Sequence, residues 1–268
     1  MMPACPFCGR PGERATRFKG IYRCGKHGAF EWFARELLDD VDLTGIYQSY
    51  PYNRSIRQDF ERMEAAYIRG LRRRVLRHFP RTEGLSFLDV GCANGEFLRA
   101  ARALKMGPVA GVEVDEEAKA KASAYGPVFS SQDELHGQFD VVQCKNVLTN
   151  IPDFHAFYQK LLERTKPGGV IFLDVLNQFG LVARAKKTLG RPGLLRPPFV
   201  INGFSKKSVA ALARLNRTEP VWMTTSFVSS DLFPYKKTVK LLLRGWLTKM
   251  LGAATVIAAD IVRAGSED

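Results

Sequence analysis

The sequence predicts an α/β fold built on a largely parallel sheet, and three observations support this prediction. The apolar residues 87–90 suit a buried parallel strand and end in a tight turn of small residues at 91–95. A helix-like segment then leads to a second strand that ends in an acid, Glu113, and a further apolar run follows at 139–144. This order of strand, turn, helix and strand is the layout of a nucleotide site in α/β proteins.

The composition of the small-residue turn narrows the choice of ligand. A dinucleotide fingerprint spaces its glycines as G-x-G-x-x-G, whereas this turn reads Asp89-x-Gly91-x-Ala93-x-Gly95 and lacks the third glycine. The carboxylate of Asp89 would repel a diphosphate but could orient an ammonium group. Glu113 is placed to accept hydrogen bonds from two ribose hydroxyls. A cofactor that joins adenosine to an amino acid fits these features better than a purely structural glycine turn does.

Residues 88–95 resemble the motif of the class I S-adenosylmethionine-dependent methyltransferases, which reads roughly Leu-Asp-Val-Gly-Cys-Gly-Thr-Gly. Later segments are similar to this family in the same order: 139–144 to its fourth strand, 161–165 to a helix, and 166–173 to a turn and its fifth strand. The resemblance covers residues 85 to about 177 and thins beyond, where 254–259 resemble the last strand. It implies a Rossmann-like, seven-stranded methyltransferase sheet.

The same resemblance implies a set of residues that bind S-adenosylmethionine. The turn would hold the methionine part of this cofactor, and Glu113 would hold the ribose. Ser131 and Gln132 stand where the family contacts adenine, and Lys145 follows the fourth strand beside the methyl-bearing sulfur, although ordinary loop residues explain these three equally well. The complete expected set is Asp89, Gly91, Cys92, Ala93, Asn94, Gly95, Glu113, Val114, Ser131, Gln132 and Lys145.

One departure from the family bears on the mechanism. Many relatives that methylate a hydroxyl have Glu-His at the positions of Thr149 and Asn150, where an imidazole is a plausible general base. The nearest histidine here, His155, reads as a partly exposed surface residue. Methyl transfer to an already nucleophilic atom needs only proximity and in-line alignment, so catalysis is still expected. The sequence assigns no catalytic residue.

The amino-terminal residues carry two short metal-binding patterns. Cys5-x-x-Cys8 and Cys24-x-x-His27 are each followed by a glycine and are separated by fifteen residues. Together they offer a closed tetrahedral set of ligands for Zn²⁺, which would be structural because no coordination position remains open. The alternative is four unrelated residues on a disordered tail. Cys92 and Cys144 lie outside this set, and we expect them to be small buried residues.

The segment between the zinc ligands and the sheet contains candidates for a lid. Tyr50 and Tyr52 precede a predicted helix from about residue 55 to 79 that carries several arginines. In small-molecule methyltransferases of similar layout such an aromatic segment covers the cofactor, but packing between modules is an equal alternative. The arginines could bind phosphate, although a solvated helix face is the more common role.

The carboxyl-terminal part has a long connection after the fifth strand, which we interpret as a substrate cap. Residues 235–251 have apolar positions at helical spacing and an adjoining basic face. Such a helix could contact an anionic membrane from one side, but more often it packs on its own domain. The expected organisation is a zinc-binding module at 1–40, a linker and lid helix at 41–80, the cofactor core at 81–180, and the cap with the last strands at 181–268.

Composition sets further bounds on the kind of protein. The 268 residues include five cysteines and no apolar stretch near the roughly 20 residues of a membrane span, so we expect a cytoplasmic protein without disulfides. The net charge of +13 is uneven: residues 1–80 carry fifteen basic and nine acidic residues, 81–176 ten and thirteen, and 177–268 fifteen and five. Because the basic surplus lies in the flanks, an anionic acceptor or carrier is expected.

These features lead to one preferred function and two alternatives. The preferred one is methylation, on oxygen or carbon, of a small-molecule, sugar, glycan or lipid-linked acceptor, because the zinc pairs, cap and basic flanks occur together in similar enzymes. The first alternative is an rRNA base methyltransferase, which the charge of +13 would suit. The second is a cofactor-binding scaffold without catalysis, which the residues Thr149 and Asn150 would suit.

Overall fold

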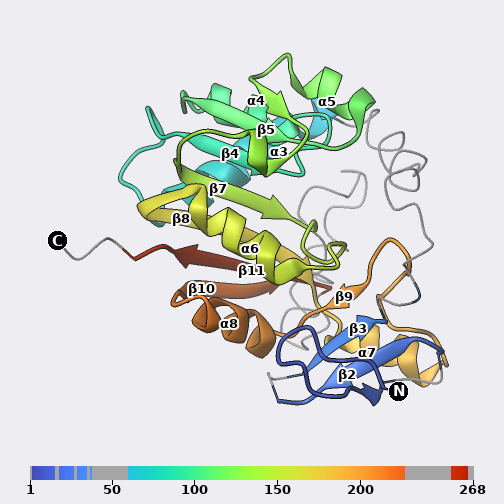
Figure 1. Cartoon of the computed structure of the whole chain (residues 1–268). Helices are drawn as coiled ribbons and strands as arrows, with labels where there is room; N and C mark the ends of the chain where they lie inside the picture. The colour runs from blue at the N-terminus through green and yellow to red at the C-terminus, as the bar shows by residue number, and fades with distance from the viewer. Residues whose placement is uncertain are drawn as a thin grey trace.

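The computed structural model describes residues 2–15, 18–26, 29–34, 37, 60–226 and 255–264 (Figure 1). Four sequence predictions lie outside the described residues. They are the zinc ligand His27, the lid residues Tyr50 and Tyr52, and the helix at 235–251.

A seven-stranded sheet forms the centre of the molecule, as the sequence predicts. Its order is β10-β11-β8-β7-β4-β5-β6. β4 pairs in parallel with both β5 and β7, whereas β11 runs antiparallel to both of its neighbours. The strands are β4 (Phe87–Val90), β5 (Val109–Val112), β6 (Val128–Phe129), β7 (Phe139–Lys145), β8 (Thr165–Leu176), β10 (Glu219–Ser226) and β11 (Val256–Val262).

Helices cover both faces of this sheet and explain why its strands are apolar throughout. The helices are α3 (Phe60–Val75), α4 (Glu96–Ala103), α5 (Glu116–Ala122), α6 (Phe154–Glu163), α7 (Leu181–Thr188) and α8 (Lys206–Leu215). Val141 of β7 and Phe172 of β8 pack with α3 and α4. Their chain neighbours Val142 and Ile171 point to the other face and pack with α6 and α8. Strands buried on both faces need apolar side chains at consecutive positions.

The helix before β8 differs from the sequence prediction, which placed it at 161–165. α6 begins at Phe154, because the Asp153 carboxylate accepts a hydrogen bond from the Ala156 backbone N–H (3.2 Å) and so caps the helix. Thr165 already belongs to β8. No helix among the described residues has both the length and the apolar composition that a membrane crossing requires.

A second, antiparallel sheet lies beside the first, next to α7 (Figure 1). Its strands, in order, are β1 (Glu13–Arg14), β2 (Ile21–Cys24), β3 (Phe30–Phe33) and β9 (Asn202–Gly203). The last strand comes from the carboxyl-terminal part of the chain. One face of this sheet is apolar, and Phe30 packs against Phe154 of α6 (ring centroids 5.3 Å apart) and against Phe204 (5.2 Å). The two sheets therefore share one hydrophobic core.

The opposite face of the small sheet carries a buried polar network that reaches α7. Glu31 is fully buried, and its carboxylate accepts hydrogen bonds from Arg23 of β2 (2.6 Å), Lys187 of α7 (2.8 Å) and Gln178 (2.8 Å). Burial lowers the pKa of Lys187, although Glu31 opposes this shift. The network ties segment 178–187 to the amino-terminal strands.

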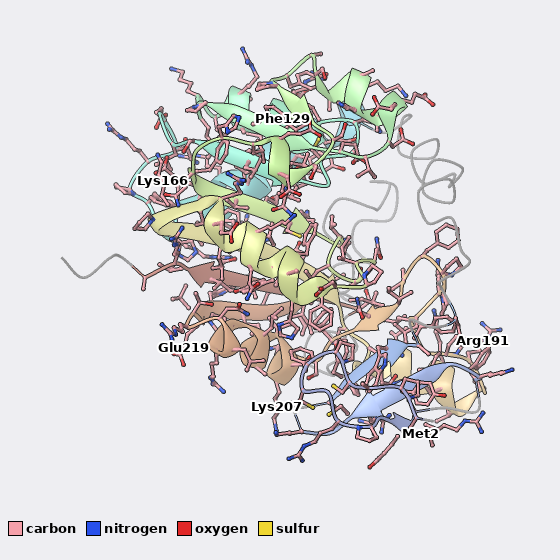
Figure 2. All side chains as sticks on the ribbon, in the orientation of Figure 1. Met2, Phe129, Lys166, Arg191, Lys207 and Glu219 are labelled. Carbon is pink, nitrogen blue, oxygen red and sulfur yellow. The ribbon has the colours of Figure 1, made fainter. Side chains whose placement is uncertain are left out.

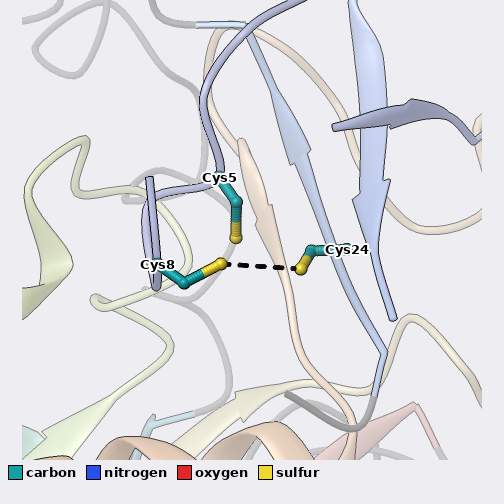
Figure 3. A group of neighbouring side chains, drawn as sticks. All are labelled: Cys5, Cys8 and Cys24. Atoms are coloured by element: carbon teal, nitrogen blue, oxygen red, sulfur yellow. Dashed lines mark hydrogen bonds between the residues drawn. The ribbon is translucent and has the colours of Figure 1, made fainter. Parts of the chain in front are cut away.

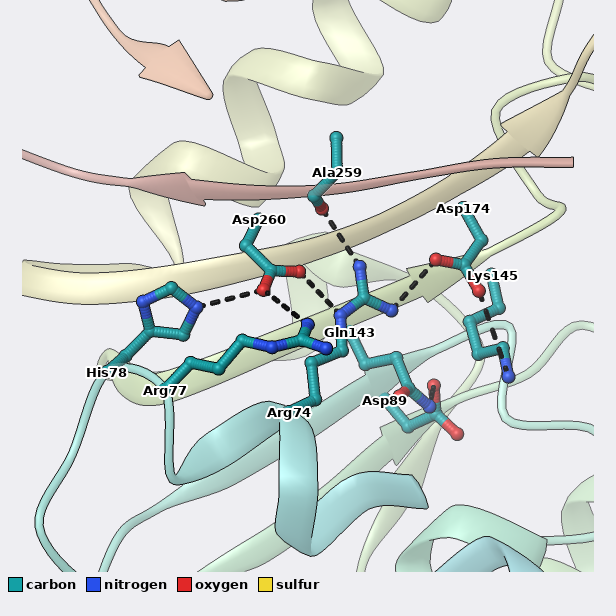
Figure 4. A network of polar contacts seen from close by, with 9 residues as sticks. All are labelled: Arg74, Arg77, His78, Asp89, Gln143, Lys145, Asp174, Ala259 and Asp260. Atoms are coloured by element: carbon teal, nitrogen blue, oxygen red, sulfur yellow. Dashed lines mark hydrogen bonds and ion pairs between the residues drawn. The ribbon is translucent and has the colours of Figure 1, made fainter. Parts of the chain in front are cut away.

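Ion pairs fix α3 against the sheet (Figure 4). Asp260 of β11 is fully buried and accepts hydrogen bonds from Arg74 Nε (2.6 Å) and Arg77 (3.4 Å), and it contacts His78 Nε2 (2.9 Å). Arg74 also bonds to Asp174 of β8 (2.8 Å). The expectation that the helix arginines form a solvated or phosphate-binding face is therefore wrong for Arg74, because buried carboxylates on the sheet pair with it, whereas Arg77 is exposed.

The substitution Asp260→Asn should lower the free energy of unfolding by about 3 kcal/mol, because it leaves buried cations without their counter-charge. Urea unfolding measures this change. Asp133→Asn serves as the control, because Asp133 forms an exposed pair with Lys160 and its loss should have no measurable effect. Equal stability of Asp260→Asn and the wild type would contradict the role given to this network.

Candidate functional site

The carboxyl ends of β4, β5 and β7 meet at one edge of the large sheet. From β4 the chain crosses to β5 on one side, and it later returns as β7 on the other side. The strand ends at such a change of direction are where α/β proteins bind their ligands. The expected residues Asp89, Glu113 and Lys145 stand at or near the ends of these three strands.

The turn after β4 has an unusual backbone. Gly91, Ala93 and Gly95 all have positive φ angles, of 79°, 48° and 86°. A Cβ atom on Gly91 would lie 2.2 Å from Val147 Cγ2 in the loop after β7, so glycine is required there. Ala93 shows that the second position tolerates a methyl group. The backbone N–H groups of Gly91 and Cys92 donate to the Val112 carbonyl (2.8 and 3.0 Å), and that of Gly95 donates to the Cys92 carbonyl (2.9 Å), so the left-handed residues fold the turn tightly against the end of β5.

Glu113 follows β5 and lies against this turn. Its carboxylate accepts hydrogen bonds from the backbone N–H groups of Ala93 (2.8 Å), Val114 (2.9 Å) and Asp115 (3.0 Å). Burial raises the pKa of Glu113, and these three bonds oppose the rise. Val114 itself is 51% exposed. The carboxylate is thus held in one orientation beside the turn and still has lone pairs for a ligand's hydroxyl groups.

Asp89 is the buried charge of the site. Its side chain accepts a hydrogen bond from Gln143 Nε2 of β7 (3.1 Å). Burial raises the pKa of Asp89 to about 7, while the Gln143 bond and the charge of Lys145 act in the opposite direction. A cationic ligand group would stabilise the ionised form of this carboxylate.

Two further expected residues carry buried acceptor atoms without a hydrogen-bond partner among the described residues. They are Asn94 Oδ1 in the turn and Gln132 Oε1 after β6. Ser131 caps the short 3₁₀ helix Gln132–Glu134, and its hydroxyl accepts a bond from the Asp133 N–H (3.1 Å). Buried polar atoms normally have partners, so these two oxygens indicate a missing donor. An ammonium group or an adenine amine would supply one, and the donor set therefore fits an adenosyl amino acid.

Lys145 lies on the far side of Asp89 from Glu113. Its Nζ is 3.8 Å from Asp174 Oδ2, a pair that Figure 4 shows. The same atom is 4.2 Å from the centre of the Phe97 ring. Thr149 is buried, and its hydroxyl donates to the Asn146 carbonyl (3.0 Å), as does the Asn150 amide (3.2 Å). These two residues hold the loop after β7 and carry no proton-transfer group.

Sequence reasoning missed Gln143, Asp174 and Arg74. The register of the parallel strands places Gln143 beside Asp89 and Asp174 beside Lys145. Gln143 and Lys145 are polar residues two positions apart in an apolar strand, which was a readable signal that this strand face meets a polar site. Arg74 reaches Asp174 from a helix 100 residues earlier in the chain, and no local pattern reports such a contact.

Three of the four expected metal ligands come together in the small sheet (Figure 3). The sulfur atoms of Cys5, Cys8 and Cys24 all lie within 4.8 Å of one another, and those of Cys8 and Cys24 are 3.9 Å apart. A tetrahedral Zn²⁺ with bonds of about 2.3 Å spaces its sulfurs by about 3.8 Å, so the arrangement fits zinc. Phe7, which lies between Cys5 and Cys8 in the chain, packs edge-on against His155 of α6.

Comparisons with known proteins agree with this geometry. Residues 60–216 match a family model described as a methyltransferase domain. The ubiquinone biosynthesis O-methyltransferase of Pseudomonas paraeruginosa is 33% identical over 107 residues, which are 35% of this chain and 46% of the relative. The enzyme of the same name from Shewanella halifaxensis is 29% identical over 177 residues, which are 59% of this chain and 74% of the relative. The chain thus spans about half the length of the first of these relatives.

Solved structures share the fold at low sequence identity. A methyltransferase from Mesorhizobium loti aligns with a TM-score of 0.52 and 16% identity over 69% of this chain and 94% of its own. A methyltransferase from Archaeoglobus fulgidus aligns with a TM-score of 0.53 and 14% identity over 83% of this chain and 100% of its own. Since the family model covers more than half of the chain and the seven-stranded sheet is the one expected, this protein belongs to the class I S-adenosylmethionine-dependent methyltransferases.

Proposed function

We propose that this protein methylates a hydroxyl oxygen of a small molecule. The observation that carries the proposal is the set of polar groups at the ends of β4, β5 and β7, where a buried carboxylate, a carboxylate fixed by backbone N–H groups and two unpartnered acceptors lie around one turn. S-adenosylmethionine, when bound, supplies an electrophilic methyl group on a sulfonium.

Each polar residue at these strand ends has a part in this proposal. Asp89 binds the ammonium group of the cofactor, and Glu113 accepts hydrogen bonds from its ribose. The backbone of the turn passes beside the methionine part, and Gln132 accepts from the adenine amine. The proposed cofactor-binding residues are Asp89, Gly91, Cys92, Ala93, Asn94, Gly95, Glu113, Val114, Ser131, Gln132 and Lys145.

The choice of a hydroxyl acceptor rests on the relatives, which are named O-methyltransferases of ubiquinone biosynthesis. The basic flanks of the chain favour an acceptor that is itself anionic or joined to an anionic carrier, such as a nucleotide sugar or a lipid-linked glycan. The same charge favours RNA as a second candidate acceptor.

We also propose a structural Zn²⁺ bound by Cys5, Cys8 and Cys24, with His27 as the fourth ligand. Its support is the sulfur spacing of the three cysteines and the C-x-x-H pattern that contains the fourth residue. The metal would hold the loop around Phe7 against β2, and so hold the apolar face of the small sheet on α6.

The acceptor class is tested by incubating the pure protein with labelled cofactor and separate pools of phenols, nucleotide sugars, glycolipids and RNA. We expect label in a small-molecule pool, on oxygen. Label in RNA alone would replace the proposal by RNA methylation, and tight cofactor binding without transfer to any pool would support a scaffold.

Asp89→Asn should weaken binding of S-adenosylhomocysteine by about 10- to 100-fold, the effect of losing a hydrogen bond between charged groups. In the wild type the affinity should rise between pH 6 and pH 8, because the pKa of about 7 makes Asp89 ionise in this range and only the anion attracts the ligand's ammonium. Isothermal titration calorimetry measures both effects.

Asp89→Asn should also leave the ligand-free protein at least as stable as the wild type at pH 8. A carboxyl whose pKa is raised by folding destabilises the native state increasingly as pH rises from about 4 to about 7, and asparagine removes this penalty. Glu219→Gln is the control with an unchanged affinity, because Glu219 forms an exposed pair with Arg214 at the start of β10. The same pH dependence of binding in Asp89→Asn and the wild type would contradict the ammonium contact.

Freshly purified protein that has met no chelator should contain about one zinc per chain. Cys8→Ser and His27→Ala should each reduce the metal content and the melting temperature, because a structural metal contributes its binding free energy to folding. Cys92→Ser is the matched control for the metal content alone, since Cys92 lies in the turn after β4, outside the cluster and buried in the core. Less than half an equivalent of zinc in the wild type would contradict the metal site.

A further inference from the structure

A cavity of about 440 Å³ lies between the small sheet and the connection that follows α7. One wall includes Ile21 at the start of β2 and Phe33 at the end of β3, and the other wall is formed by residues 192–197. The volume falls in the range of about 300–1,000 Å³ that is typical of small-molecule sites. No described residue of the lining belongs to the proposed cofactor-binding set, so the cavity is a second candidate site.

The interior of this cavity is apolar. Ile21 and Leu195 line it and are buried, and Phe33 lies between the two wall segments in the list of contacts as a half-buried ring. Phe18 also lines the cavity and is exposed. An apolar body that enters removes such surfaces from water, which is favourable in proportion to the area covered. The lining therefore suits a hydrocarbon group.

Buried hydrogen bonds hold the wall formed by residues 192–197. Gln178 is fully buried, and its Nε2 donates to the Pro192 carbonyl (2.9 Å) and to the Glu31 carboxylate of β3 (2.8 Å). The Leu194 N–H donates to Gln178 Oε1 (2.8 Å). Because these bonds fix the wall to β3 before a ligand arrives, little conformational freedom is lost on binding.

Two cations line the cavity, one from each wall. Lys19 precedes β2 and Arg196 belongs to the other wall, and both are exposed. Neither side chain forms an ion pair or a hydrogen bond with another described residue. The described lining includes no acid, and residues 177–218 contain nine basic and no acidic residues. The local potential therefore favours an anion, and two positive charges match a dianion.

We propose that this cavity binds a phosphate monoester of an apolar alcohol. The hydrocarbon part lies against Ile21, Phe33 and Leu195, and the phosphate lies at Lys19 and Arg196. A phosphate monoester carries a charge of about −1.5 to −2 at pH 7, so two cations favour it over a carboxylate. The site goes beyond the proposed function, because binding here needs neither the cofactor nor methyl transfer.

The wall that carries Arg196 continues to the loop after β7. The N–H groups of Ile201 and Asn202 donate to the Thr149 carbonyl (3.0 and 2.9 Å), and the Ile201 carbonyl accepts a bond from the Phe33 N–H (2.9 Å). Arg196 and Ile201 are five residues apart, which is at most about 18 Å of chain. A ligand in the cavity is thus held by a segment that also bonds to the loop after β7.

Isothermal titration calorimetry with hexyl phosphate, in the absence of cofactor, tests the site. We expect saturable binding to one site per chain, whereas hexanol and inorganic phosphate should each bind at least about 10-fold more weakly, because each supplies one half of the interaction. From butyl to octyl phosphate, each added CH₂ should raise the affinity by about 3- to 4-fold until the cavity is filled. The affinity should also rise from pH 5 to pH 7, as the phosphate takes its second charge.

Substitutions locate the phosphate. Lys19→Met and Arg196→Met should each weaken the binding of hexyl phosphate by about 5-fold, the effect of one partly exposed ion pair, and the double variant by about the product of the two. Both side chains are exposed, so the melting temperatures should match that of the wild type. Lys207→Met is the matched control with unchanged affinity, because Lys207 is exposed at the start of α8 (Figure 2).

Several results would overturn the inference. Inorganic phosphate that binds as tightly as hexyl phosphate would leave the apolar cavity without a part, and unchanged affinity in both Lys19→Met and Arg196→Met would place the ligand elsewhere. Hexanoate that binds more tightly than hexyl phosphate at pH 8 would contradict the choice of a dianion. Binding to vesicles of an anionic phospholipid, without binding of free hexyl phosphate, would replace the cavity by a membrane-binding surface.

Discussion

The close approach of two loops, one after β4 and one after β7, is the constraint on which the rest of the site depends. Gly91 has a left-handed backbone and comes so near to Val147 that no side chain fits between them. This contact brings the ends of two neighbouring strands together, and it sets Asp89 and Lys145 on one edge. Gly95, at the end of the same turn, is also too close to a neighbour for a side chain, because a Cβ atom would lie 2.9 Å from the Ala122 backbone of α5. The turn is thereby fixed before any ligand binds.

A fixed turn can store electrostatic free energy for binding. Asp89 is held in a buried place that raises its pKa to about 7, and Glu113 is held by three backbone N–H groups. Neither carboxylate stabilises the ligand-free protein as a charge, because the free energy lost by removing a carboxylate from water exceeds what its hydrogen bonds to neutral groups regain. The cost is explained if a cationic and hydrogen-bonding ligand completes the site. The two unpartnered oxygens of Asn94 and Gln132 point to the same conclusion.

Local patterns in the sequence were sufficient for β4, β5, β7 and β8, for the turn and for the cysteine cluster. Each of these depends on residues that are near one another in the chain, such as the run 87–95 or the pairs at Cys5 and Cys24. The contacts that the sequence did not reveal join distant segments. Arg74 to Asp174, Glu31 to Lys187, and β9 to β3 each depend on tertiary pairing, which has no local signature. The bounds of α6 were wrong for a different reason, since the cap at Asp153 was overlooked.

The small amino-terminal sheet is built into the molecule from both of its faces. Phe30 joins the common core on one face, and Glu31 pairs with Arg23 and Lys187 on the other. Because α7 and β9 come from the carboxyl-terminal part, segment 178–204 contacts the amino-terminal strands directly. A metal bound by the three cysteines would therefore support the connection that follows β8, at the same end of the strands as the proposed acceptor.

A crystal structure with S-adenosylhomocysteine bound tests the central claim most directly. The account predicts the ammonium group beside Asp89, both ribose hydroxyls on Glu113, and donors from the ligand on Asn94 Oδ1 and Gln132 Oε1. The sulfur should then lie next to Lys145, with the space beyond it open to an acceptor. A ligand bound at another edge of the sheet, or bound here with its amino-acid end turned away from Asp89, would contradict the account.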